Sequence, residues 1–82
     1  MNEAVLATIQ RRFAGRRAAV AHMYADSGSF RTLCQDYATC LAALEGWRAS
    51  EALEAATRLE EYEELLGELS DEIETRLDEA GR

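Results

Sequence analysis

The sequence contains no proline, and only five of its 82 residues are glycine and two are cysteine. These low counts exclude a collagen-like chain, a proline-rich linker and a small scaffold held together by several disulfides. Alanine, leucine, glutamate and arginine dominate instead, and all four are good helix formers. We therefore predict a single helical domain over residues 1–82, with the small core that a chain of this length can bury.

Long apolar runs are also missing from the sequence. No stretch of about 18 apolar residues occurs, so we expect no membrane-spanning helix. The first residues, Met-Asn-Glu, do not begin the basic and then apolar pattern of a secretory signal. We therefore expect a cytoplasmic protein that does not act at a membrane, and in that compartment its two cysteines are expected to be thiols.

Lysine is absent, and nine arginines stand against sixteen acidic residues, which gives a net charge of −7. The charge is unevenly distributed, since residues 1–31 carry a net charge of +3 and residues 51–82 carry −9. Binding to phosphate groups needs clustered cations. The overall balance therefore argues against nucleic acid, and against an anionic membrane, as the main partner.

Three segments carry apolar residues at alternating three- and four-residue steps, which is the pattern of an amphipathic helix. They cover residues 3–25, 29–45 and 51–79. A four-residue turn beginning at Asp26 separates the first two, and Gly46 is expected to cap the end of the second. Connections this short join antiparallel neighbours. The fold class we predict is all-α: an antiparallel three-helix arrangement with a long third helix and coiled-coil-like packing.

The third helix is expected to outrun the second by about 19 Å, at a rise of 1.5 Å per residue. In an up-down-up arrangement, its last turns then extend past the first helix and leave Leu69, Ile73 and Leu77 uncovered. An uncovered apolar stripe usually marks an interface. Together with Trp47, these residues form the predicted interaction surface, and a homodimer is the favoured assembly. The alternative is a monomer whose last helix bends or frays after Gly67.

The basic first helix and the acidic third helix also match in charge. Arg11, Arg12, Arg16 and Arg17 are expected to face glutamates between residues 60 and 68, within one chain or between chains. The alternative is that these four arginines bind an anion.

Cys34 and Cys40 are six residues apart, which on a helix is about 240° of rotation and about 9 Å of rise. Their side chains therefore point to different faces, and no disulfide can join them within one helix. Both are expected to be thiols packed in the core. The alternative is a thiol site that combines Cys34 and Cys40 with Asp36, Tyr37 and His22.

No catalytic or cofactor-binding motif is present in the sequence. Glu-x-x-His pairs for a di-iron site, glycine-rich phosphate loops and Gly-x-Ser-x-Gly elbows are all missing. One histidine and two cysteines also lack the spacing of a zinc site. We therefore expect no enzyme activity, no cofactor and no resident metal.

Two segments of the sequence carry a resemblance. Residues 30–40 read Phe-Arg-Thr-Leu-Cys-Gln-Asp-Tyr-Ala-Thr-Cys, and residues 61–66 read Glu-Tyr-Glu-Glu-Leu-Leu. Over residues 24–78 the chain resembles a group of short, uncharacterised bacterial all-helical proteins with a Phe-x-x-Leu-Cys-x-Asp-Tyr-x-x-Cys segment and a glutamate-rich C-terminal helix. The resemblance implies a bacterial cytoplasmic origin. It implies no activity, because no function is assigned to that group.

These observations predict a small protein–protein interaction or regulatory module that works as a homo-oligomer, with an unidentified protein as a further partner. The alternative belongs to a different class: a thiol-based redox sensor, or a small ligand or metal carrier, that uses the segment from Cys34 to Cys40. The two hypotheses differ in one measurable property. A sensor needs a reactive thiolate with a lowered pKa, whereas packed thiols react slowly.

Overall fold

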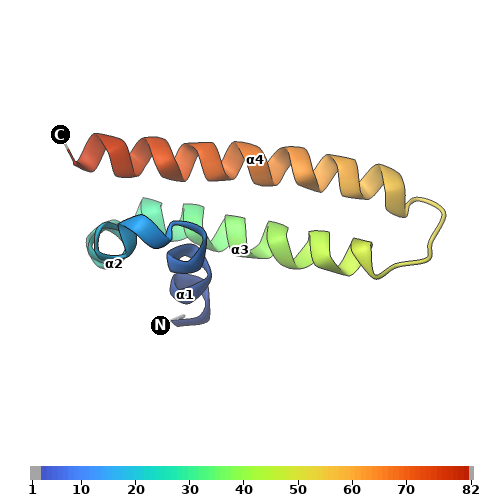
Figure 1. Cartoon of the computed structure of the whole chain (residues 1–82), viewed down its shortest axis with the longest axis horizontal. Coiled ribbons are helices and arrows are strands. Elements are labelled where there is room, and N and C mark those ends of the chain that lie inside the picture. The colour runs from blue at the N-terminus through green and yellow to red at the C-terminus, as the bar shows by residue number, and fades with distance from the viewer. Residues whose placement is uncertain (1–2, 82) are drawn as a thin grey trace.

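The computed structural model describes residues 3–81, and every element in that range is helical (Figure 1). The α-helices are α1 (Glu3–Arg12), α2 (Arg17–Asp26), α3 (Gly28–Arg48) and α4 (Ala55–Ala80), and a short 3₁₀ turn, η1 (Ala14–Arg16), joins α1 to α2. The predicted all-α class is confirmed. The predicted number of helices is wrong, because the described range holds four α-helices where the sequence pattern indicated three.

The helices α3 and α4 form a long antiparallel hairpin, in which they lie side by side (Figure 1). The helices α1 and α2 gather at one end of this hairpin, near the start of α3 and the end of α4. We call residues 3–26 the head, and residues 40–69 of the hairpin the stem. Figure 1 shows the hairpin extending well beyond the head, so within the described chain the part of the stem far from the head has no third layer.

The molecule is elongated, measuring 45 × 24 × 22 Å along its principal axes. Its radius of gyration is 13.7 Å, against about 12 Å for a compact domain of this length. It exposes 5365 Å² of surface, roughly a tenth more than a compact monomer of this mass. An uncovered stem accounts for this extra surface.

The predicted helix over residues 3–25 breaks near Phe13 instead of running through. Phe13 has φ −117° and ψ 55°, outside the helical region, and the 3₁₀ turn follows it. Its side chain is buried in the core together with side chains from both sides of the break. A straight helix of that length would carry part of its apolar stripe past the hairpin, whereas the break allows both α1 and α2 to pack there.

The other boundaries also differ from the prediction. Ser27 caps α3, because its Oγ accepts a hydrogen bond from the Phe30 amide at 3.2 Å. Gly46 does not end this helix, which continues to Arg48, and no described glycine has a positive φ. The last helix begins at Ala55 rather than at residue 51, after an irregular connection.

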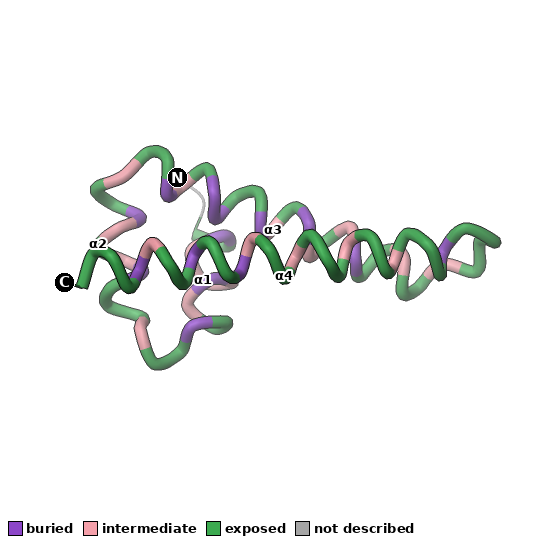
Figure 2. The backbone as a smooth tube through the Cα atoms, turned by 90° about the horizontal axis from the view of Figure 1, so that it is seen from above, coloured by how far each residue is buried: buried purple, intermediate pink, exposed green. Residues whose placement is uncertain are grey.

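The hydrophobic core lies where the head meets the hairpin, and all four helices contribute to it. Figure 2 shows the buried residues gathered at this end, while the stem is mostly exposed or intermediate. The large side chains that are fully buried include Ile9, Val20, Phe30, Ile73 and Leu77.

The predicted uncovered end of the last helix is therefore covered. Ile73 and Leu77 have 0% and 1% of their surface exposed, so they offer no surface to a partner. They belong to the core cluster with side chains of α1, α2 and α3, because the break at Phe13 brings the whole head against this end of the hairpin. The uncovered end is the opposite one, where α3 ends and α4 begins.

Candidate functional site

Two open grooves run along the hairpin, one on each side of the seam between α3 and α4. The first, which we call the apolar groove, has a volume of about 310 Å³ and a mainly apolar lining. It is lined by Asp36, Thr39, Cys40, Ala43, Tyr62, Leu65 and Leu69.

Large apolar side chains stay partly exposed in the apolar groove. Leu65 is 42% exposed, and Tyr62 and Leu69 are half-buried. Cys40 ties the two helices together here, because its Sγ donates a hydrogen bond to the Tyr62 carbonyl oxygen at 3.5 Å. Apolar side chains of the stem therefore remain open to solvent in this groove.

The second groove, which we call the polar groove, has a volume of about 280 Å³. In it, Nη2 of Arg48 lies 4.0 Å from Oε2 of Glu63, and both side chains are more than half exposed. Ser70 is buried, and its Oγ has no hydrogen-bond partner among the described residues. The groove is lined by Arg12, Tyr37, Leu44, Arg48, Glu63, Leu66, Gly67 and Ser70.

The structure separates the four residues of the predicted interaction surface. Leu69 lies in the apolar groove, Trp47 is half-buried near the end of α3, and Ile73 and Leu77 are in the core. Leu65 is the exposed leucine of α4, and the sequence did not single it out, because spacing alone does not show which part of the hairpin lacks a third helix.

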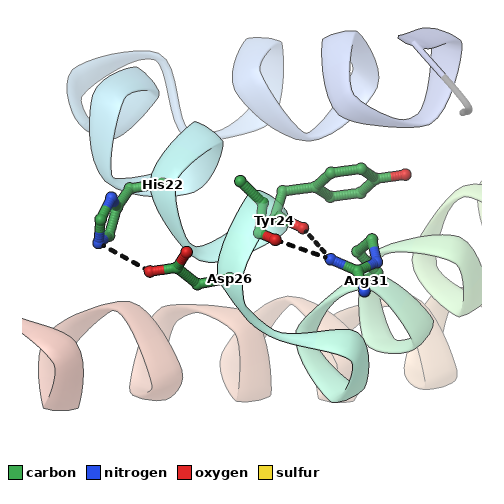
Figure 3. Close-up of polar contacts among 5 residues, drawn as sticks. His22, Tyr24, Asp26 and Arg31 are labelled. Carbon is green, nitrogen blue, oxygen red and sulfur yellow. Dashed lines mark hydrogen bonds and ion pairs between the residues drawn. The ribbon is translucent and has the colours of Figure 1, made fainter.

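The five residues of the predicted thiol site do not form one cluster. Cys34 is buried in the core and Cys40 lines the apolar groove, with the exposed Asp36 near it. Tyr37 lines the polar groove instead. His22 is exposed on α2, where its Nε2 lies 3.2 Å from a carboxylate oxygen one turn further along (Figure 3). In residues 3–81, no group of three His, Cys, Asp or Glu side chains is placed to hold a metal ion.

The environment of the thiols disfavours the thiolate form. Burial raises the pKa of Cys34 to about 12, and the charge of Arg76 opposes this effect only in part. Burial also raises the pKa of Cys40 above its ordinary value. A redox sensor needs a thiolate near neutral pH, so neither cysteine is in surroundings that favour such chemistry.

The raised pKa of Cys34 has a measurable consequence at high pH. The thiol ionises near pH 9.0 in the unfolded chain but only near 12 in the folded one, so the unfolded state loses this proton first. The contribution of Cys34 to the free energy of unfolding is therefore constant below pH 9. Above pH 9 this contribution falls by up to about 1.4 kcal/mol per pH unit.

Urea unfolding of the wild type and of Cys34→Ala, from pH about 8 to about 10.5, measures this contribution. We expect the wild type to lose stability more steeply than the variant above pH 9. If the free energy of unfolding falls with pH equally in the two proteins, Cys34 ionises at the same pH in the folded and the unfolded state.

One arginine of the head, Arg16, has a partner other than the glutamates of the stem. Nη1 of Arg16 donates a hydrogen bond of 2.6 Å to Oδ1 of Asp78, near the end of α4. Within the described residues, the glutamates of the stem that form ion pairs do so with Arg48 and Arg58, which belong to the stem itself. The described residues make no ion pair between head arginines and residues 60–68, so the predicted match stays a prediction, as does anion binding.

Comparison with protein-family models, with curated proteins and with solved structures finds no match to this chain. Over the described range, no helix combines the length and the apolar character needed to cross a membrane.

Proposed function

We propose that this chain is a small protein–protein interaction module that assembles as a homodimer through the apolar groove of its stem. The observation that carries the proposal is the exposure of Leu65 in an apolar groove that none of the described residues covers. Removing apolar surface from water contributes about 25 cal/mol per Å². Covering the groove with matching apolar surface is therefore a favourable contribution to association.

A second copy of the chain is well suited to supply this surface. Two helices on a single seam leave most of their surface exposed, whereas two stems pack as four helices, each with two neighbours. A two-fold arrangement brings Tyr62, Leu65 and Leu69 of one chain against the same residues of the other, which makes the interface self-complementary. The packing in such a dimer is coiled-coil-like.

Charge gives this dimer a characteristic salt dependence. Residues 49–68 contain seven glutamates and one arginine, so two stems repel each other at low ionic strength. Salt screens this repulsion within a Debye length of about 8–10 Å. The two chains of the dimer are therefore expected to associate more tightly as salt is raised to physiological concentration. A complex of this acidic stem with a basic partner would instead weaken as salt is raised.

The dimer leaves the head available for a further protein, which is the adaptor or regulatory role that we propose for it in the cytoplasm. The thiol-sensor hypothesis has less support. Both cysteines are buried, and burial raises the pKa of each.

Leu65→Glu tests the proposal by placing a charge at the centre of the apolar groove. We expect the wild type to have twice the mass of one 9.1 kDa chain by size-exclusion chromatography with light scattering, and Leu65→Glu to have the mass of one chain. A buried, unpaired carboxylate at each of two symmetric positions is strongly unfavourable. Circular dichroism checks that the variant keeps its helices.

Ala19→Glu is the matched control, because it adds the same charge at an exposed position of α2 in the head. It is expected to remain dimeric. The proposal is wrong if the wild type has the mass of one chain, or if both variants dissociate equally.

A further inference from the structure

We propose that the polar groove is a binding site for a small ligand that carries a carboxylate on a flat apolar body. The site lies on the opposite side of the α3–α4 seam from the apolar groove, so it is separate from the proposed dimer interface. Three independent features of the groove support it: an unpartnered hydroxyl, an unexplained glycine and two arginines.

The hydroxyl belongs to Ser70. This residue is only 6% exposed, and its Oγ has no hydrogen-bond partner among the described residues. A buried hydroxyl without a partner is unfavourable, and serines within helices usually bond to a carbonyl of the preceding turn. Ser70 lines the groove, and a rotation of its side chain toward the groove would let its hydroxyl donate a hydrogen bond to a ligand oxygen bound there.

The glycine is Gly67, one turn before Ser70 in the middle of α4. Glycine at an internal helical position weakens the helix relative to alanine. The chain itself gives no steric reason for it, because no atom beyond its own helical turn lies within 4 Å of the position that a Cβ would take. Gly67 lines the polar groove, so its missing side chain lets a flat group lie directly against the helix backbone.

The two arginines are Arg48 and Arg12, in a chain whose net charge is −7. The contact between Arg48 and Glu63 is long, at 4.0 Å, and exposed, so the guanidinium is available to a better-placed carboxylate. Arg12 lines the groove from the head, and its guanidinium lies 4.9 Å from the centre of the Phe13 ring. Both cations therefore favour an anionic ligand.

The size and the floor of the groove define the rest of the ligand. Its volume of about 280 Å³ lies just below the range for small-molecule sites, about 300–1,000 Å³, so the ligand is small. Leu44 and Leu66 provide an apolar floor beside Gly67. One ring with one carboxylate matches this combination: the ring lies over the floor, and the carboxylate accepts hydrogen bonds from Arg48 and Ser70.

Titration of the ¹⁵N-labelled full chain with benzoate, followed by NMR chemical shifts, tests this site. Benzamide, which has the same shape and no charge, is the matched probe. We expect saturable shifts for benzoate at the residues of the polar groove, and at least about tenfold weaker binding of benzamide, since charge-assisted hydrogen bonds are the stronger ones. Equal binding of the two probes, shifts confined to the head arginines, or no saturable shift would each overturn the proposal.

Four variants distinguish a binding role from a structural one. Arg48→Gln is expected to weaken benzoate binding about tenfold, and Glu63→Gln to strengthen it several-fold, because Glu63 competes for the same guanidinium. Gly67→Leu fills the groove and should abolish binding. Gly46→Leu is the control, since Gly46 is also helical and also has nothing near its Cβ position, but lines neither groove.

Benzoate binding at the polar groove is expected to be independent of the oligomeric state. The Leu65→Glu variant changes only the apolar groove, so it is expected to bind benzoate as the wild type does, whether or not the wild type is a dimer. Loss of benzoate binding in Leu65→Glu with its helices intact would contradict the assignment of two separate sites.

Discussion

Replacing Phe30 with alanine is expected to lower the free energy of unfolding by about 3–5 kcal/mol. Phe30 has none of its surface exposed and belongs to the cluster in which all four helices meet. The guanidinium of Arg76 also lies 5.9 Å from the centre of its ring, so the substitution removes a cation–π contact as well as the buried ring. The loss is a large share of the roughly 4–12 kcal/mol expected for a chain of this length.

Urea unfolding followed by circular dichroism measures this change. Leu53→Ala is the control, because Leu53 is fully exposed in the connection between α3 and α4 and its removal should change the stability by less than about 0.5 kcal/mol. A loss below about 1 kcal/mol for Phe30→Ala would mean that the head does not pack on the hairpin as described.

Replacing Arg31 with alanine is expected to cost about 1.5–3 kcal/mol, the range for hydrogen bonds made by a charged group. Nη1 of Arg31 donates hydrogen bonds to the carbonyl oxygens of Tyr24 at 2.7 Å and Ala25 at 3.1 Å (Figure 3). These carbonyls lie in the last turn of α2, where the helix provides no partners of its own. The side chain therefore fixes the end of α2 to the start of α3 and sets the angle at which the head meets the hairpin.

His22→Ala is the matched control for Arg31→Ala. Its ion pair with Asp26 is in the same helix, but both side chains are more than two thirds exposed, so its loss should change the stability by no more than about 0.5 kcal/mol. Equal effects of the two substitutions on urea unfolding would show that the capping contacts of Arg31 contribute nothing specific.

The helical content of this protein could be predicted from the sequence, but the path of its first helix could not. Apolar residues at three- and four-residue steps identify helices correctly in all three segments. The break at Phe13 has no local signal of its own, because Gly15 alone is tolerated within a helix and no proline is present. The break is set by tertiary packing, since it places Val5 and Ile9 on one side, and Val20 on the other, in one core.

That single difference explains why the predicted interaction surface was misplaced. The prediction compared the lengths of straight helices and so placed the uncovered end at Ile73 and Leu77. In the structure the head folds over that end, and the uncovered surface lies on the stem instead. Leu65 and Ser70 could not be recognised from spacing, because their significance depends on which part of the hairpin lacks a third layer. The positions of Cys34 and Cys40 on different faces did follow from helix geometry alone.

Sedimentation equilibrium of the untagged wild type, over a range of chain concentrations at physiological salt, measures whether the chain forms a dimer. We expect a mass that approaches twice 9.1 kDa as concentration rises, with tighter association at physiological salt than at low salt. A mass of 9.1 kDa at every concentration would contradict this expectation, and would mean that the exposed groove around Leu65 does not bind a second copy of the chain.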